Sequence, residues 1–251
     1  MKSLWNSFKA AFAMFSKIPM PMVDWKKENI KYMMCFFPFV GTAIGILTWL
    51  AGGILGVHAV LEPFFLAVIL TVIPVFVTGG IHVDGLLDTS DALSSWQERT
   101  RRLEILKDSH AGAFAIIVCC GYFLAAFGIW TEAEAADIGV LEVGFILSRA
   151  LNGFGICTFP CAKNSGLAAT FAQAADRKRC QIVLVIEILL CIAGMLLIDP
   201  LRGTTAAVAA VVVCLCCRRM AIKTFGGITG DIQGFFLQIC ELAMAYVVIL
   251  Q

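Results

Sequence analysis

The sequence predicts an all-α fold: a polytopic membrane helix bundle of about seven transmembrane helices, plus an N-terminal amphipathic helix at the interface. Hydrophobic residues make up 60% of the 251 residues, charged residues only 15%, and the mean hydropathy is +0.88. Soluble domains are much less apolar than this. No internal repeat, linker or change of composition divides the chain, so residues 1–251 are expected to form a single integral membrane domain.

The first expected element is the interfacial helix near the N-terminus. Its apolar residues fall on one helical face, which Lys2, Lys9 and Lys17 flank; the face consists of Leu4, Trp5, Phe8, Ala11, Phe12 and Phe15. A helix with one apolar face and flanking lysines is typical of the lipid headgroup layer.

Seven apolar stretches follow, each a candidate membrane span. They cover residues 33–56, 61–80, 112–130, 139–159, 181–198, 203–217 and 235–250. Some of them are short, which predicts tilt or partial burial. Most of the eleven cysteines lie inside these stretches, where they are expected to behave as small hydrophobic residues.

The charges between the spans predict the topology. Basic residues precede the first span and follow the second, fourth and sixth spans, whereas the other three connections hold only Arg202. The positive-inside rule therefore places the N-terminus and the polar loops in the cytoplasm and the C-terminus outside. A net charge of +1 gives no reason to expect nucleic acid as a partner.

The most informative polar segment lies between Thr78 and Ala92. In a helix, Asp84, Asp88 and Asp91 share one face, because steps of four and seven residues return to nearly the same side. Clustered carboxylates favour a hard cation such as Mg²⁺ as their partner. The alternative is that these aspartates are solvated and paired with nearby arginines of the next loop.

Neighbouring residues extend this candidate site. Gly79, Gly80 and Gly85 allow a tight exit from the second span and a close approach of the backbone to a phosphate-bearing substrate. His82 lies off the aspartate face, and it is a candidate for substrate contact as much as for metal binding. In the next loop Asp108 is a candidate fourth metal-binding carboxylate, and Lys107, Ser109 and His110 beside it are candidate phosphate contacts.

A second glycine-rich loop precedes the last span. Its amides could bind phosphate and its aspartate could bind metal; the residues are Gly226, Gly227, Thr229, Gly230 and Asp231. A helix entry capped by Asp231 is the alternative. Within the spans, Arg149, Glu142, Glu187 and Glu241 mark either a functional interior or a structural ion pair.

Four of these stretches, in this order, resemble the cobalamin synthase (adenosylcobinamide-GDP ribazoletransferase) family. They are the Phe15 to Pro21 segment, the Thr78 to Ala92 block, the Arg102 to Gly112 segment and the Gly226 to Asp231 loop. The most specific is the pattern Gly-Gly-x-His-x-Asp-Gly-x-x-Asp-x-x-Asp. One position departs from the family pattern: His110 stands where an arginine is expected, which puts a phosphate contact at this position in doubt.

The resemblance implies a Mg²⁺-dependent enzyme of cobalamin biosynthesis in a bacterial cytoplasmic membrane. A ribose hydroxyl of α-ribazole, or of its 5'-phosphate, would attack the cobinamide-linked phosphate of adenosylcobinamide-GDP. GMP would leave, and adenosylcobalamin or its 5'-phosphate would form. The sequence leaves open whether the protein is a homo-oligomer or associates with other enzymes of nucleotide-loop assembly.

Two alternatives are less favoured. A CDP-alcohol phosphotransferase also uses aspartates and Mg²⁺ at the membrane surface, but its Ala-Arg pair after Asp-Gly is missing, since Leu87-Asp88 stands there. A secondary transporter would explain Arg149, Glu187 and Glu241, but it predicts polar residues mainly near the midplane. In this chain they gather at one face.

Overall fold

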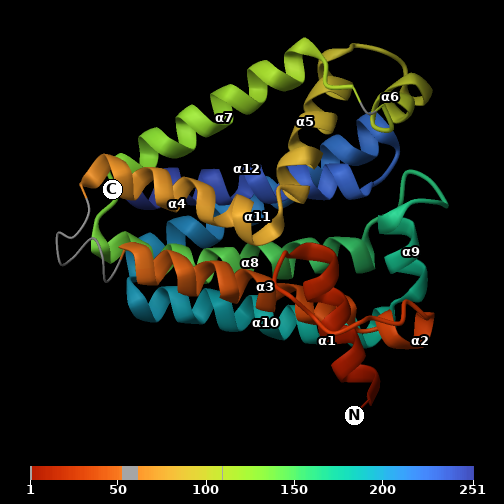
Figure 1. Cartoon of the computed structure of the whole chain (residues 1–251), viewed down its shortest axis with the longest axis horizontal. Coiled ribbons are helices and arrows are strands. Elements are labelled where there is room, and N and C mark those ends of the chain that lie inside the picture. Colours follow the sequence, from red (N-terminus) through yellow and green to blue (C-terminus); the bar gives the residue numbers. More distant parts are fainter. Residues whose placement is uncertain (1, 53–61, 109) are drawn as a thin grey trace.

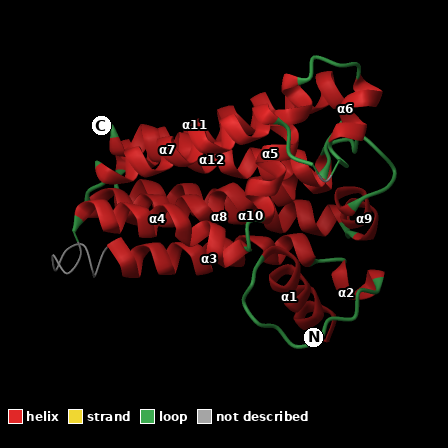
Figure 2. Cartoon of the chain, turned by 45° about the horizontal axis from the view of Figure 1, so that its top comes forward, coloured by secondary structure: helices red, strands yellow, loops and turns green. Residues whose placement is uncertain are grey.

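The computed structural model describes residues 2–52, 62–108 and 110–251, and these form a bundle of long helices (Figures 1 and 2). The helices are α1 (Lys2–Phe15), α2 (Lys27–Ile30), α3 (Met33–Trp49), α4 (Pro63–Thr78), α5 (Ile81–Ser94), α6 (Arg99–Ile105), α7 (Ala113–Thr131), α8 (Ala135–Thr158), α9 (Leu167–Ala174), α10 (Arg177–Ile198), α11 (Pro200–Met220), a π-helical turn (Ala221–Phe225) and α12 (Gly230–Ile249). The predicted all-α class is confirmed.

Six described helices are long and apolar enough to cross a membrane: α3, α7, α8, α10, α11 and α12. The shorter α4 becomes a seventh candidate when it is joined to α5, to which it is bent by 94°. The prediction of about seven spans is therefore confirmed. Several of these helices extend beyond the predicted apolar stretches, because charged residues such as Arg177 and Arg218 continue the helix past its apolar part.

Close helix contacts depend on small residues. On α3, a Cβ atom added at Gly41 would lie 2.3 Å from the carbonyl oxygen of Phe145 on α8, and one at Gly203 of α11 would lie 2.5 Å from the backbone of Met195 on α10. Glycine at these positions lets the backbones approach, as in many membrane helix pairs.

The N-terminal helix is amphipathic, as predicted, but much of its apolar face is covered by protein. Ala10, Ala11, Phe12 and Phe15 are buried, and the Phe15 ring lies 4.2 Å from that of Phe37 on α3 (centroid to centroid). Leu4 and Trp5 at the outer end are about half exposed. The helix therefore forms part of the wall of the bundle.

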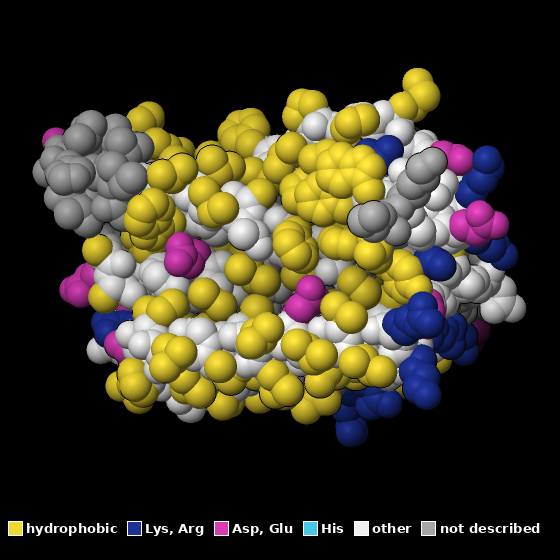
Figure 3. Space-filling model, turned by 90° about the horizontal axis from the view of Figure 1, so that it is seen from below, with side chains coloured by type: hydrophobic (Ala, Val, Ile, Leu, Met, Phe, Trp, Pro, Cys, Tyr) yellow, Lys and Arg dark blue, Asp and Glu magenta, His cyan; other side chains and the backbone are white. Residues whose placement is uncertain are grey.

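The two ends of the bundle differ in charge. Figure 3 shows Lys and Arg side chains gathered at one end, which is the end where α1, α6 and α9 lie in Figure 1. The C-terminus lies at the opposite end, together with the α7–α8 connection. This distribution is the one that the sequence pattern predicts.

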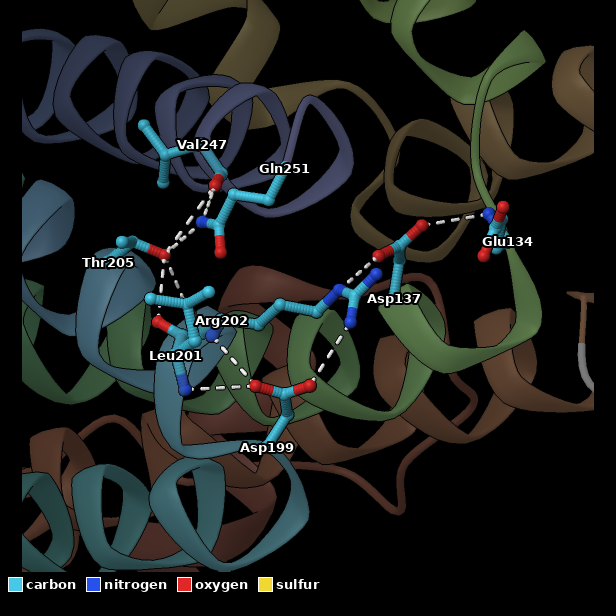
Figure 4. A network of polar contacts seen from close by, with 8 residues as sticks. All are labelled: Glu134, Asp137, Asp199, Leu201, Arg202, Thr205, Val247 and Gln251. Carbon is cyan, nitrogen blue, oxygen red and sulfur yellow. Dashed lines mark hydrogen bonds and ion pairs between the residues drawn. The ribbon is translucent and has the colours of Figure 1, made fainter.

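The basic residue at the far end is neutralised. Arg202 contacts Asp137 at 2.8 Å and Asp199 at 3.1 Å, and Asp199 also accepts hydrogen bonds from the backbone N–H groups of Leu201 and Arg202 (Figure 4). Asp137 in turn accepts from the N–H of Glu134. Arg202 thus joins the ends of α8 and α11 without leaving an unpaired positive charge there.

Candidate active site

The bend between α4 and α5 arises from two adjacent glycines. Gly79 and Gly80 have φ values of 67° and 79°, a left-handed conformation that glycine adopts without steric cost. A Cβ atom at Gly79 would also lie 2.1 Å from the side chain of Lys17. The pair ends the apolar helix α4 and starts α5, which carries the aspartates and leads to α6 at the basic end of the bundle (Figure 1).

Asp84, Asp88 and Asp91 all lie on α5, so the predicted helix is confirmed. They are joined by Asp231 of α12, because α5 crosses α12 closely at Gly85: a Cβ atom there would lie 2.6 Å from the carbonyl oxygen of Asp231. Burial, followed by the negative charges of Asp84, Asp231 and Asp91, raises the pKa of Asp88 to about 7. Four carboxylates from two helices therefore form one cluster.

The start of α7 closes one side of this cluster. A Cβ atom at Gly112 would lie 2.0 Å from a carboxylate oxygen of Asp91, so glycine is required for the loop to approach that carboxylate. The 102–112 segment therefore contacts the aspartate helix, as expected, and the residue that makes this contact is Gly112.

Asp108 has a different environment. Its carboxylate accepts hydrogen bonds from the backbone N–H and from Nδ1 of His110, at 3.0 and 2.8 Å, and these contacts lower the pKa of Asp108. Both side chains are exposed. The structure thus pairs Asp108 with His110 and does not bring it to the other aspartates. Ser109 lies outside the described residues.

The loop from Gly226 to Asp231 is fixed by backbone contacts. Ile228 donates to the carbonyl of Pro160 and accepts from the N–H of Ala162, and Gly227 packs against the same segment. Gly226 has a φ of 78°, and the guanidinium of Arg99 covers it. Thr229 accepts a hydrogen bond from the N–H of Ile232 and so caps α12; the alternative in which Asp231 is the cap is wrong.

A basic pocket of about 370 Å³ lies beside Asp231. Lys107, Lys163, Thr229 and Gly230 line it, together with the first residues of α9. Burial and the neighbouring charge of Lys107 lower the pKa of Lys163, whose ammonium also donates to the carbonyl of Leu103 at 2.6 Å. Two lysines and the amino ends of two helices provide a site for a polyanion such as a diphosphate.

A second pocket, of about 220 Å³, adjoins the basic pocket, and Asp84 and Asp231 both line it. His82 forms part of its wall. Burial, followed by the positive charge of Arg149, lowers the pKa of His82 well below its ordinary value. His82 is therefore neutral at physiological pH.

The donor chemistry of the cluster fits Mg²⁺, although it provides no complete cage. Within residues 2–52, 62–108 and 110–251, no group of three or more His, Cys, Asp or Glu side chains is arranged to hold a metal ion. Mg²⁺ typically takes only one or two protein carboxylates and completes its shell with water and substrate phosphates. Four oxygen-bearing side chains beside a basic pocket suit that mode of binding.

Four residues at the site were not among the individual site residues predicted from the sequence. Arg99 covers the Gly226 turn, Lys163 completes the basic pocket, and Asn152 and Gln233 line the second pocket. A signal existed for the last two, because they are polar residues within otherwise apolar spans.

Comparison with known proteins agrees with this geometry. A family model described as cobalamin-5-phosphate synthase matches residues 7–249. The chain belongs to this family. An adenosylcobinamide-GDP ribazoletransferase from Lachnoclostridium phytofermentans is 41% identical over 248 residues, covering 98% of this chain and 94% of its own.

Two further relatives bear the same name. The protein from Geobacillus sp. (strain WCH70) is 32% identical, with 95% of this chain and 93% of its own covered, and that from Clostridium botulinum (strain Alaska E43 / Type E3) is 30% identical, with 96% of each covered. No solved structure matches the chain. Membership of this family of enzymes sets aside the CDP-alcohol phosphotransferase and transporter alternatives.

Proposed function

We propose that this chain joins adenosylcobinamide-GDP to α-ribazole, or to α-ribazole 5'-phosphate, and releases GMP. The name of the relatives suggests the substrates. The observation that carries the proposal is the position of Asp231, which lines both the basic pocket and the second pocket and belongs to the carboxylate cluster. A diphosphate and a hydroxyl-bearing acceptor can therefore meet at the cluster.

In this reaction a ribose hydroxyl forms a new O–P bond with the cobinamide-linked phosphorus. The P–O bond of the diphosphate breaks, GMP departs with the bridging oxygen, and the hydroxyl proton passes to water or to a carboxylate. Lys107, Lys163 and the helix amides of the basic pocket are assigned to the phosphate oxygens. Positioning and charge stabilisation supply most of the catalysis in such transfers.

Asp84, Asp88, Asp91 and Asp231 are the residues proposed to hold Mg²⁺. Bound there, the ion would neutralise charge on the reacting phosphates. Without a cation, the same carboxylates would repel the diphosphate. The pKa of Asp88 is raised first by burial and then by the charges of the other aspartates, so ionised carboxylates are costly here. Asp108 was predicted as a further ligand; its pairing with His110 makes it the weaker candidate.

We further propose that this end of the bundle faces the cytoplasm of a bacterial cell and that the bundle crosses the cytoplasmic membrane. The basic residues of α1, α6, the loop before α9 and the first turn of α10 support this orientation.

The test is GMP release by the purified protein in liposomes that contain adenosylcobinamide-GDP, α-ribazole and Mg²⁺, with a chelator as control. We expect metal-dependent GMP release and a corrinoid that has gained one ribazole. GMP release without the joined corrinoid would show hydrolysis and contradict the proposed transfer. Full activity in the chelator would contradict the metal assignment alone.

A further inference from the structure

The second pocket differs in character from the basic pocket beside it. Three aromatic rings stand in its wall, those of Phe15, Phe37 and Phe171, and they come from α1, α3 and α9. The centroid of Phe15 lies 4.2 Å from that of Phe37 and 6.0 Å from that of Phe171. Ile156 and Leu237 add further apolar surface. Such a pocket suits a flat, mainly apolar ring system.

His82 in this wall has an unusual environment. Its side chain is 5% exposed and lies beside the Phe15–Phe37 pair, with its ring centroid 6.3 Å from that of Phe15 and 5.8 Å from that of Phe37. Neither Nδ1 nor Nε2 has a hydrogen-bond partner in the described part of the chain. A buried polar group without a partner costs free energy, and such a group beside a pocket is a common sign of a missing ligand. Asn152 is already occupied, since its amide donates to the carbonyl of Gln233.

We propose that this pocket binds the base of the acceptor nucleoside, a benzimidazole, with His82 donating a hydrogen bond to its free ring nitrogen. This assignment rests on the proposed function and adds to it the place where the acceptor binds. The base of α-ribazole has an apolar benzo ring with two methyl groups and one ring nitrogen free to accept. The base therefore needs one hydrogen-bond donor within otherwise apolar surroundings. In this pocket His82 can be the donor, and the three Phe rings with Ile156 and Leu237 form the apolar surface.

The guanine of adenosylcobinamide-GDP fits this pocket poorly. Guanine has donors and acceptors around most of its edge, and burying it against Phe, Ile and Leu side chains would leave several of them unpaired. Of the polar side chains in this pocket, Asp84 and Asp231 are assigned to the cation and the Asn152 amide already donates to Gln233. Among the described residues, His82 and the Gln233 amide nitrogen remain without a partner, too few for the edge of guanine. The guanosine portion is instead expected on the side of the basic pocket, where Lys107 and Lys163 bind its phosphates.

The location of the pocket also suits an acceptor. Asp84 and Asp231 line its inner edge, so a ribose attached to a base in the pocket lies at the carboxylate cluster. The two pockets share Leu167, Ala168, Gly230 and Asp231 along their common boundary. Acceptor and diphosphate can thus meet along this boundary, next to Asp231, where the two are held close to each other.

Equilibrium binding of α-ribazole and of GMP to the purified protein in nanodiscs, without any corrinoid, tests the assignment. His82→Leu keeps the apolar volume and removes the hydrogen bond, so the Kd for α-ribazole should rise about fivefold to tenfold while that for GMP stays unchanged. Ile156→Phe should fill the pocket and weaken α-ribazole further. Ile146→Phe, the same substitution on the same helix away from the pocket, is the matched control.

A ribazole analogue without the two methyl groups should bind roughly tenfold more weakly to the wild-type protein, because the favourable burial of two methyl groups is lost. In turnover, His82→Leu should raise the KM for α-ribazole and leave that for adenosylcobinamide-GDP unchanged. If both variants instead weaken GMP, the pocket binds guanine and the assignment is overturned. If α-ribazole binds with these sensitivities but no GMP is released, the proposed transfer fails while the acceptor pocket stands.

Discussion

Asp88 combines two properties that oppose each other, a proposed role in the reaction and a cost to stability. Its pKa of about 7, against an ordinary value of 3.8, means that the folded protein binds this proton more tightly than the unfolded chain. The stability from that proton is fully present below pH 3.8 and is lost as the pH rises through 7. Above pH 7, the metal-free protein bears the full cost of an ionised Asp88 among three other carboxylates.

Asp88→Asn should therefore raise the unfolding temperature of the metal-free protein at pH 8 and have little effect near pH 4. The same substitution should lower turnover at least about a hundredfold, because a cation site loses a ligand. Thermal melts in detergent at both pH values, with a chelator present, measure the first effect. A lower unfolding temperature at pH 8 would show that ionised Asp88 is already compensated within the protein.

Arg149 and Glu241 form the most deeply buried ion pair in the described residues. Arg149 is fully buried, and its Nη1 contacts Glu241 at 2.6 Å and the carbonyl of Phe145 at 2.9 Å. The sequence left open whether Arg149 serves function or pairs with a glutamate, and the structure shows the pairing. The pair joins α8 to α12, the helix that carries Asp231.

Glu241→Gln should destabilise the protein by about 3–5 kcal/mol, because it leaves a guanidinium without its counter-charge. Arg149→Met combined with Glu241→Gln should recover most of that loss, and the folded double variant should retain turnover. Thermal unfolding of both variants in the same detergent makes the comparison. A double variant that folds well and is inactive would assign a functional role to the pair.

At the scale of elements, the crossing of α5 and α12 determines the geometry of the site. The helices approach through Gly85 and Gly234, and a Cβ at Gly234 would lie 3.0 Å from the carbonyl oxygen of His82. This contact sets the separation between the aspartates of α5 and Asp231. Adding one methyl group at the crossing should therefore change the spacing of the carboxylates, although none of the aspartates is itself substituted.

Gly85→Ala should lower the stability by about 1–3 kcal/mol, since the new methyl group meets backbone atoms that cannot move independently. Turnover should fall further than the stability loss explains, because Asp84 and Asp88 move away from Asp231. Gly121→Ala on α7 is the matched control: nothing lies within 4 Å of its added Cβ, and it should leave both properties unchanged. Equal effects of the two substitutions on turnover would contradict this role of the crossing.

The sequence predicted the individual helices far better than the contacts between helices that are distant in the chain. Apolar stretches located the spans, and the spacing of Asp84, Asp88 and Asp91 gave their common face, because both depend on local periodicity. The approach of Asp231 to these residues depends on the Gly85 contact between distant helices, which no local pattern encodes. For the same reason, Asp108 was grouped with the cluster, whereas His110, two residues away, is its partner.

At the scale of the whole molecule, charge segregation predicts how the bundle lies in the membrane. Apart from Arg149 and Arg202, every lysine and arginine falls in the N-terminal segment or in the connections and helix ends beside the site. Arg202, at the far end, is paired with Asp137 and Asp199, so it adds no net positive charge there (Figure 4). The asymmetry between the two ends is therefore greater than a simple count of basic residues suggests.

This asymmetry predicts that the C-terminus lies outside the cytoplasm. A reporter that is active only outside, such as alkaline phosphatase, should be active when fused after Gln251, and green fluorescent protein fused there should stay dark. Both reporters fused after Ala174, in the basic segment before α10, should show the opposite behaviour. Removing Asp137 and Asp199 together exposes the charge of Arg202 and should weaken the preference, so that some copies invert. A fluorescent C-terminal fusion in the wild-type background would place the site outside, where no cytoplasmic supply of a GDP-activated substrate could reach it.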